Sequence, residues 1–165
     1  MTRRLPRDLL LVHLLCALVV GVLWWRLSPE LEYTVVEGTP YTLDEVQTGE
    51  VVAADGVFAL LGLAAGVLCA AVLLLRRYGG PWLSVGLAVG GLLGSGAAWA
   101  LGTWLGPGRL ADLVGAAADQ EVVVPGPELA AYGVLLVWPI TAVVVALVAA
   151  WLTGPPPRPV PPSPR

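Results

Sequence analysis

Hydrophobic residues are gathered into four long runs, and the charged residues lie at their ends and between them. The runs are Leu9–Trp25, Val57–Leu75, Pro81–Leu105 and Leu129–Leu152, and none of them contains Lys, Arg, Asp or Glu. At a rise of about 1.5 Å per residue, a helix of this length crosses the roughly 30 Å of hydrocarbon in a bilayer. The pattern therefore predicts an all-α membrane protein that folds as an antiparallel four-helix transmembrane bundle.

The organisation of the chain follows from these runs. We expect a single membrane domain, residues 1–152, with spans near 9–26, 56–75, 81–105 and 130–152 and outer loops at 28–54 and 106–128. Residues 153–165 are rich in proline and would form a disordered cytoplasmic tail of polyproline II character. This tail is either a solvated end or a ligand for a proline-binding protein.

The placement of charge predicts the orientation of the bundle. All nine basic residues are arginines. If the spans alternate, seven of them fall on one side of the membrane: Arg3, Arg4, Arg7, Arg76, Arg77, Arg158 and Arg165. Because short arginine-rich segments stay in the cytoplasm, we expect a multi-pass protein of the cytoplasmic membrane with both termini in the cytoplasm.

Aromatic residues stand near the ends of the runs. An outer belt would contain Trp24, Trp25, Trp104 and Tyr132, and an inner belt would contain Tyr78, Trp82 and Trp151. Such belts are typical of the two membrane–water interfaces. Trp99 and Trp138 lie deeper in the runs, so we expect them to pack between helices.

Small residues recur at every fourth position of the third span, at Gly86, Gly90, Gly94, Ala98 and Gly102; Gly62 and Gly66 form a shorter repeat in the second span. Such a glycine zipper lets a second backbone approach closely in lipid. The short link from Arg76 to Pro81 predicts that the second and third spans are antiparallel neighbours. The stripe would therefore pack span three on span two within one chain, or it would form the seam of a homo-oligomer.

The outer loops contain signals for a small β-cap. Leu31–Val36 alternates and is rich in β-branched residues, the segment 37–40 is typical of a turn, and 41–43 could return as a second strand. In the second outer loop, residues 121–124 indicate another strand. Residues 109–118 place apolar side chains at helical spacing, which favours a short helix.

One group of polar residues within the spans could carry chemistry. His13 and Cys16 are three residues apart on one face of span one, and Cys69 lies at a similar depth in span two. Such a trio could bind a soft metal or respond to the redox state. The alternative is simple packing, because the trio lacks a clear fourth ligand and buried cysteine behaves as a small hydrophobic residue.

Other residues of the spans argue against catalysis and active transport. Ser95 is about 13 Å in depth from His13 by residue count, so the pair cannot form a protease dyad. The absence of lysine excludes a Walker A loop and a Schiff-base enzyme. A proton-coupled transporter needs a carboxylate within a span, whereas Asp55 lies at an outer edge. We expect no enzyme, no cofactor, no bound metal and no nucleic-acid binding.

Three short motifs resemble a known family. They are residues 24–29 (Trp-Trp-Arg-Leu-Ser-Pro), residues 53–60 (Ala-Ala-Asp-Gly-Val-Phe-Ala-Leu) and residues 135–139 (Leu-Leu-Val-Trp-Pro). Together they resemble an uncharacterised family of four-span membrane proteins from actinobacteria, a domain of unknown function, over about residues 9–152. The resemblance implies the same four-span fold and supplies no catalytic residue.

These observations predict a non-enzymatic accessory or structural component of a cell-envelope complex. Its partners would be the lipid bilayer and another membrane protein. The alternative is a small homo-oligomeric channel or transporter, whose passive pore would be lined by backbone and by Ser84, Thr103 or Thr141. The acidic outer loops lack the spacing of a calcium-binding loop, which favours a solvated surface over a cation site.

Overall fold

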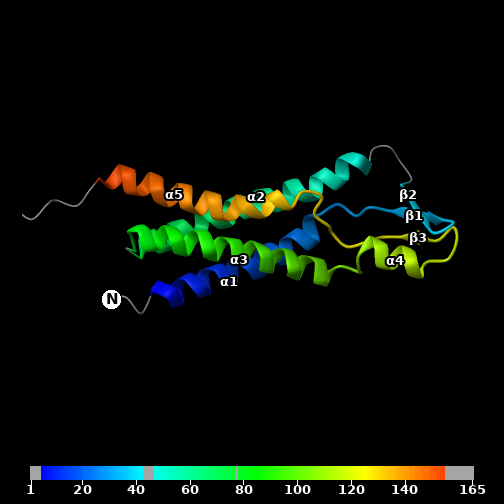
Figure 1. Cartoon of the computed structure of the whole chain (residues 1–165), viewed down its shortest axis with the longest axis horizontal. Coiled ribbons are helices and arrows are strands. Elements are labelled where there is room, and N and C mark those ends of the chain that lie inside the picture. The colour runs from blue at the N-terminus through cyan, green and yellow to red at the C-terminus, as the bar shows by residue number, and fades with distance from the viewer. Residues whose placement is uncertain (1–4, 43–46, 77, 155–165) are drawn as a thin grey trace, which may run out of the picture.

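Four long helices lie side by side in the computed structural model, with a small cap of strands at one end (Figure 1). The structure describes residues 5–42, 47–76 and 78–154. The long helices are α1 (Leu5–Leu27), α2 (Gln47–Leu75), α3 (Pro81–Leu105) and α5 (Val137–Thr153). The predicted helical fold with a small sheet is confirmed, and all four helical segments are long and apolar enough to cross a membrane.

The ends of three of the long helices differ from the apolar runs, and α1 extends beyond its run at both ends. α3 has the bounds of its run, with Pro81 at its first position, where proline removes no helical hydrogen bond. α2 begins at Gln47, within the segment 28–54 predicted to be an outer loop, because a helix can continue beyond its apolar part. α5 is preceded by a 3-10 turn, η1 (Tyr132–Leu136).

The order of the helices around the bundle is α1, α3, α5, α2. α2 and α3 follow each other in the chain, yet they lie diagonally across the bundle and barely touch. The prediction that they are antiparallel neighbours is therefore wrong. The chain direction alternates from helix to helix (Figure 1), so α1 runs parallel to α3 and α2 runs parallel to α5.

We call the contact between α1 and α3 the α1/α3 seam. A Cβ atom added to Gly86 would lie 2.6 Å from Leu9 Cδ1, and one added to Gly90 would lie 2.9 Å from the His13 ring. Farther along, Gly21 of α1 meets the Ala98 carbonyl oxygen at 2.8 Å by the same measure. The offset between the two helices is constant, so two rows of residues spaced by four interdigitate as ridges and grooves.

We call the contact between α2 and α5 the α2/α5 seam. An added Cβ on Gly62 would lie 3.6 Å from Trp138 N, whereas one on Gly66 would lie 2.7 Å from Trp138 O. On the other side of α5, Gly94 of α3 makes room for the Trp138 ring, at 3.2 Å from the added Cβ. The glycine stripe therefore packs within the chain, but against α1 and α5 and not against α2.

The two outer segments join in one three-stranded sheet. β1 (Tyr33–Val36) pairs antiparallel with β2 (Thr39–Thr42) and with β3 (Val122–Val123), which follows α4 (Leu110–Ala116). The turn between β1 and β2 is shorter than predicted and consists of Glu37 and Gly38, both with positive φ. Such a turn matches the twist of a hairpin.

Trp24 corrects the predicted outer aromatic belt. Its side chain is fully buried, packs edge-to-face on Phe58 at 5.1 Å between ring centroids, and donates from Nε1 to the Ala54 carbonyl oxygen at 3.0 Å. Gly102 makes the space for this ring. Other belt residues are on the surface, including Trp82, Trp104, Tyr132 and Trp151. A tryptophan near a span end can therefore belong to the core when a glycine faces it.

Candidate functional site

The predicted trio of polar residues lies where the four helices meet. We call His13, Cys16, Cys69 and Trp138 the central cluster. His13, Cys69 and Trp138 are buried, and Cys16 is partly buried. Trp138, deep in its run as predicted, brings α5 to the residues of α1 and α2. The sequence pattern placed the trio correctly but did not indicate that Trp138 joins it.

The hydrogen bonding of His13 fixes its tautomer. Its Nδ1 lies 2.8 Å from the Leu9 carbonyl oxygen. A carbonyl oxygen can only accept, so Nδ1 carries the hydrogen and Nε2 is left as an acceptor. Nε2 is buried and has no hydrogen-bond partner among the described residues, and the same holds for Nε1 of Trp138. Two polar atoms therefore remain unsatisfied at the centre of the bundle.

The two rings of the central cluster stack on each other. The His13 and Trp138 centroids are 6.0 Å apart and the ring planes differ by 12°. Gly90 lies against the imidazole and Gly94 against the indole, so a side chain at either position would displace a ring. The glycine stripe thus creates the space that this aromatic pair occupies.

The two thiols of the central cluster touch. Cys16 Sγ and Cys69 Sγ are 3.6 Å apart, which joins α1 to α2. Within the described ranges, no group of three or more His, Cys, Asp or Glu side chains is placed to hold a metal ion. The structure therefore supports a pair of cysteines beside a stacked histidine, and it does not support the soft-metal interpretation of the trio.

Two apolar grooves run along the outside of α1. The first, of about 290 Å³, lies between α1 and α2 and has Cys16 in its wall together with Leu15, Val19, Leu61 and Leu68. The second, of about 390 Å³, lies between α1 and α3 and includes His13 and Gly90. Both members of the cluster on α1 therefore border space that an apolar molecule could enter from the side.

Asp55 has a role that its position in the sequence does not indicate. It lies well inside α2, not at a helix start, and its side chain is buried. Its two carboxylate oxygens accept from Ala130 N at 3.0 Å and from Ala131 N at 2.8 Å. These amides belong to the two residues that lead into η1, so Asp55 fixes the segment immediately before η1 to α2. We call this contact the outer clamp.

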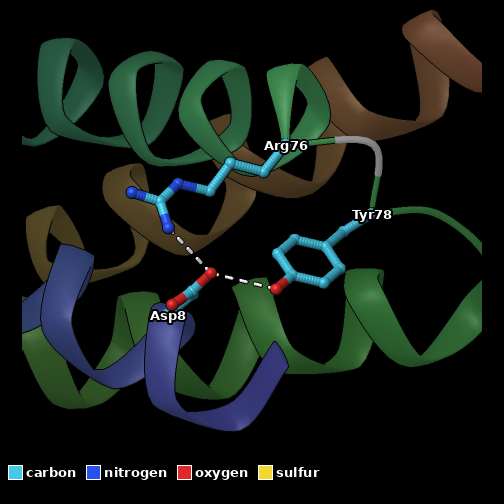
Figure 2. A network of polar contacts seen from close by, with 3 residues as sticks. All are labelled: Asp8, Arg76 and Tyr78. Carbon is cyan, nitrogen blue, oxygen red and sulfur yellow. Dashed lines mark hydrogen bonds and ion pairs between the residues drawn. The ribbon is translucent and has the colours of Figure 1, made fainter. Parts of the chain in front are cut away.

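The opposite end of the bundle has its own carboxylate, as Figure 2 shows. Asp8 of α1 accepts from Arg76 Nη1 and from the Tyr78 hydroxyl, both at 2.9 Å. We call this group the inner clamp. Arg7 is exposed beside it. Arg76 thus has a structural partner besides its predicted effect on topology, whereas Arg3, Arg4 and Arg77 lie outside the described residues.

Several acidic residues of the cap bind backbone amides. Asp119 Oδ1 accepts from Glu37 N at 2.8 Å, and Glu128 Oε1 accepts from Leu110 N at the start of α4 at 3.2 Å. The negative charge of Glu128 and partial burial raise the pKa of Tyr33 above its usual value, and burial has the larger effect. These carboxylates hold the loops in place, which favours the solvated-surface interpretation over a cation site.

Two hydroxyl groups of α3 are bound within their own helix. Ser95 is buried and donates to the Leu92 carbonyl oxygen at 3.1 Å. Thr103 lies within 3.0 Å of the Trp99 and Ala100 carbonyl oxygens. The His13 ring lies against Gly90, five residues from Ser95 in α3, so the depth difference of about 13 Å predicted by residue count is too large.

Comparison with protein-family models, with curated protein sequences and with solved structures finds no match to this chain. The resemblance to an actinobacterial four-span family therefore stays a prediction that rests on the three motifs alone. The functional argument has to start from the arrangement of the chain's own residues.

Proposed function

We propose that this chain is a multi-pass protein of the cytoplasmic membrane, with both termini in the cytoplasm, that serves as a non-enzymatic accessory or structural component of a cell-envelope complex. Two observations support the membrane location. The four helical segments have the length and hydropathy of spans. Their outward faces carry large apolar side chains, such as Leu10, Leu60, Leu93 and Val148. A water-exposed surface of this kind would be unfavourable, whereas lipid accommodates it.

The charge at the two ends supports the orientation. Leu5 and Thr153 lie at the same end of the bundle (Figure 1), and Arg7 and Arg76 are exposed there. The opposite end carries the β-cap with a set of exposed acidic residues, namely Glu30, Glu32, Glu37, Asp112, Asp119, Glu121 and Glu128. The positive-inside rule then puts the arginine end in the cytoplasm and the cap outside.

The observation that carries the accessory role is the occupation of the glycine stripe. Gly86, Gly90, Gly94 and Gly102 each face a side chain from α1 or α5 of the same chain. Trp24, Phe58 and Trp138 fill the centre. A homo-oligomeric pore would need either a free small-residue face or an open interior, so it is less well supported. The cap and the lipid-facing surface remain available for a partner.

The orientation is tested by labelling cysteines in a variant that lacks Cys16 and Cys69. A cysteine at Glu32 in the cap should react with a membrane-impermeant maleimide on intact cells, because this side chain is exposed. The matched control is a cysteine at Gly79, which is exposed at the opposite end and has no atom within 4 Å of an added Cβ. It should react only after the membrane is opened. The reverse pattern would contradict the proposed orientation.

The accessory role is tested by native mass spectrometry of the protein extracted from its own membrane in mild detergent. We expect a second polypeptide in reproducible stoichiometry. The matched variant replaces Glu32 and Asp112 with Lys, which reverses charge on the cap outside the four long helices, and it should reduce the amount of that partner. A homo-oligomer of fixed size without a second polypeptide would instead favour a pore, and a monomer alone would contradict both interpretations.

A further inference from the structure

Two thiols from different helices meet in the interior of the bundle. Cys16 Sγ and Cys69 Sγ are 3.6 Å apart, which is van der Waals contact for sulfur. A disulfide has an S–S length of about 2.05 Å, so the two atoms must approach by about 1.5 Å, a distance that small side-chain rotations cover.

The pair is reached from the side of the bundle. Cys16 is partly buried and lies in the wall of the apolar groove between α1 and α2, while Cys69 behind it is fully buried. The other wall residues are aliphatic, including Leu15, Val20, Leu61 and Leu68. A molecule that enters this groove therefore comes from the hydrocarbon phase, if the helices span a membrane as proposed above.

Because the thiols are reached through an apolar groove, only some classes of oxidant can react with them. Exchange with a water-soluble disulfide proceeds through a thiolate, and an ionised sulfur is disfavoured in apolar surroundings. A lipid-soluble quinone can reach the thiols within the apolar groove, and it takes up two protons with the two electrons, so the overall reaction leaves no net charge there. It is also an apolar molecule that partitions into the region where the groove opens.

We propose that Cys16 and Cys69 form a redox-active dithiol within the membrane, which a lipid-soluble quinone closes to a disulfide. The two S–H bonds break and one S–S bond forms. The quinone receives the two electrons and two protons and leaves as the quinol, so the reaction is balanced without a further reactant. The product links α1 covalently to α2, two adjacent antiparallel helices, and the reverse reaction with quinol or another reductant restores the thiols.

The test uses the full chain in lipid nanodiscs, first reduced and then mixed with decylubiquinone. The ring of this quinone is fully substituted, so it cannot add to a thiol. We expect the intact mass to fall by two hydrogen atoms, maleimide labelling after denaturation to fall from two adducts to none, and one quinol to form per chain. Retention of both thiols would overturn the proposal.

A matched variant separates this geometry from general thiol reactivity. Cys16→Ala combined with Leu15→Cys keeps two thiols at the same depth, but it moves one to a position whose side chain is 62% exposed on the outer face of α1. Loss of the preorganised contact should slow disulfide formation about 100-fold. Circular dichroism checks that the variant is folded. An equal rate in this variant, or a disulfide between two chains, would overturn the proposal.

The oxidant is tested separately with glutathione disulfide at the same concentration. Oxidation should then be at least about 100-fold slower than with decylubiquinone, because the thiolate is required in apolar surroundings. Equal rates with both oxidants would overturn the lipid-borne route. Flotation of the nanodiscs establishes membrane insertion beforehand, and the accessory role is judged by its co-purified partner, so the two proposals fail independently.

Discussion

The α1/α3 seam and the α2/α5 seam are both contacts between parallel helices that use glycine, yet they differ in what the glycine meets. On the α3 side of the α1/α3 seam, Gly86, Gly90 and Gly102 have side-chain atoms of Leu9, His13 and Trp24 as their nearest neighbours, whereas Gly21 on the α1 side faces the Ala98 carbonyl oxygen. In the α2/α5 seam, Gly66 faces the Trp138 carbonyl oxygen and the Ala142 backbone nitrogen. A side chain can rotate to relieve a clash, whereas two packed backbones have to move apart.

Glycines with equal spacing in the sequence do not contribute equally to helix packing. Five small residues mark the α3 stripe, but its contacts are largely with side-chain atoms. The shorter α2 repeat includes one position, Gly66, where the helices themselves come together. We therefore expect a methyl group added at Gly66 to force two helices apart, whereas one added at Gly86 meets the end of the Leu9 side chain, which can rotate away.

The largest effect should come from filling the α3 stripe with the double variant Gly90→Leu, Gly94→Leu, because Gly90 faces His13 of α1 and Gly94 faces Trp138 of α5. Both rings of the His13–Trp138 stack would be displaced, at a cost of about 5 kcal/mol or more, which a marginally stable bundle does not survive. The measurement is unfolding by sodium dodecyl sulfate in mixed micelles. Val85→Leu with Val89→Leu is the control, since both side chains are about half exposed on the same helix. A folded monomer in the double Leu variant would contradict packing within the chain and would favour the stripe as the interface of a homo-oligomer.

Next in size should be Gly66→Ala. Its Cβ would lie 2.7 Å from Trp138 O, so α2 and α5 must separate, and we expect a loss of about 3 kcal/mol. Gly62→Ala is the matched control one turn away, where the nearest atom is at 3.6 Å and the change should be within about 0.5 kcal/mol. The same unfolding assay compares the two variants. Equal losses would show that the α2/α5 seam is not set by backbone contact.

Asp55→Ala should weaken the outer end of the α2/α5 seam. It leaves the amides of Ala130 and Ala131 without their acceptor, which we expect to cost about 2 kcal/mol and to increase hydrogen exchange at η1. Asp8→Ala at the inner clamp is the control, because it removes contacts to side chains that water can replace, and exchange at η1 should not change. Unchanged exchange in Asp55→Ala would mean that the outer clamp does not hold η1.

The smallest effect should be a gain from Gly96→Ala. This helical glycine belongs to neither seam, and an added Cβ meets no atom within 4 Å. Alanine restricts the unfolded backbone and favours the helix, so we expect stabilisation of about 0.5 kcal/mol. The midpoint of thermal unfolding in detergent is the measurement. A destabilised Gly96→Ala would point to a contact with a second chain at this position.

The sequence predicted the elements well and their partners poorly, for physical reasons. A long apolar run predicts a helix, and alternation in residues 31–36 predicts a strand, because both signals are local. The small residues of the α3 stripe predict only that another helix packs closely against α3. Its partners are α1 and α5 because Leu9 and Trp138, which are distant in the sequence, face this stripe. Asp55 was misjudged because its partners are backbone amides, which no residue type reveals.

The central cluster shows the same limit at the level of a site. Cys16 and Cys69 were predicted at a similar depth from residue counting, and their contact agrees with that estimate. The stacking of His13 on Trp138 could not be predicted. It requires Gly90 and Gly94 to face the interior of the bundle together, where their lack of a side chain leaves room for the two rings. Depth follows from sequence, whereas rotation of a helix about its axis follows from packing.

The diagonal placement of α2 and α3 has a consequence for biogenesis. Helices that leave the insertion machinery as a hairpin commonly pair at once, but here the hairpin partners barely touch. If the helices span a membrane as proposed, α3 can dock on α1 as soon as it enters the bilayer, while α2 waits for α5, which is synthesised after α3. A nascent chain stopped before Val137 would therefore leave one span without its principal neighbour, exposed to quality-control proteases until synthesis is complete.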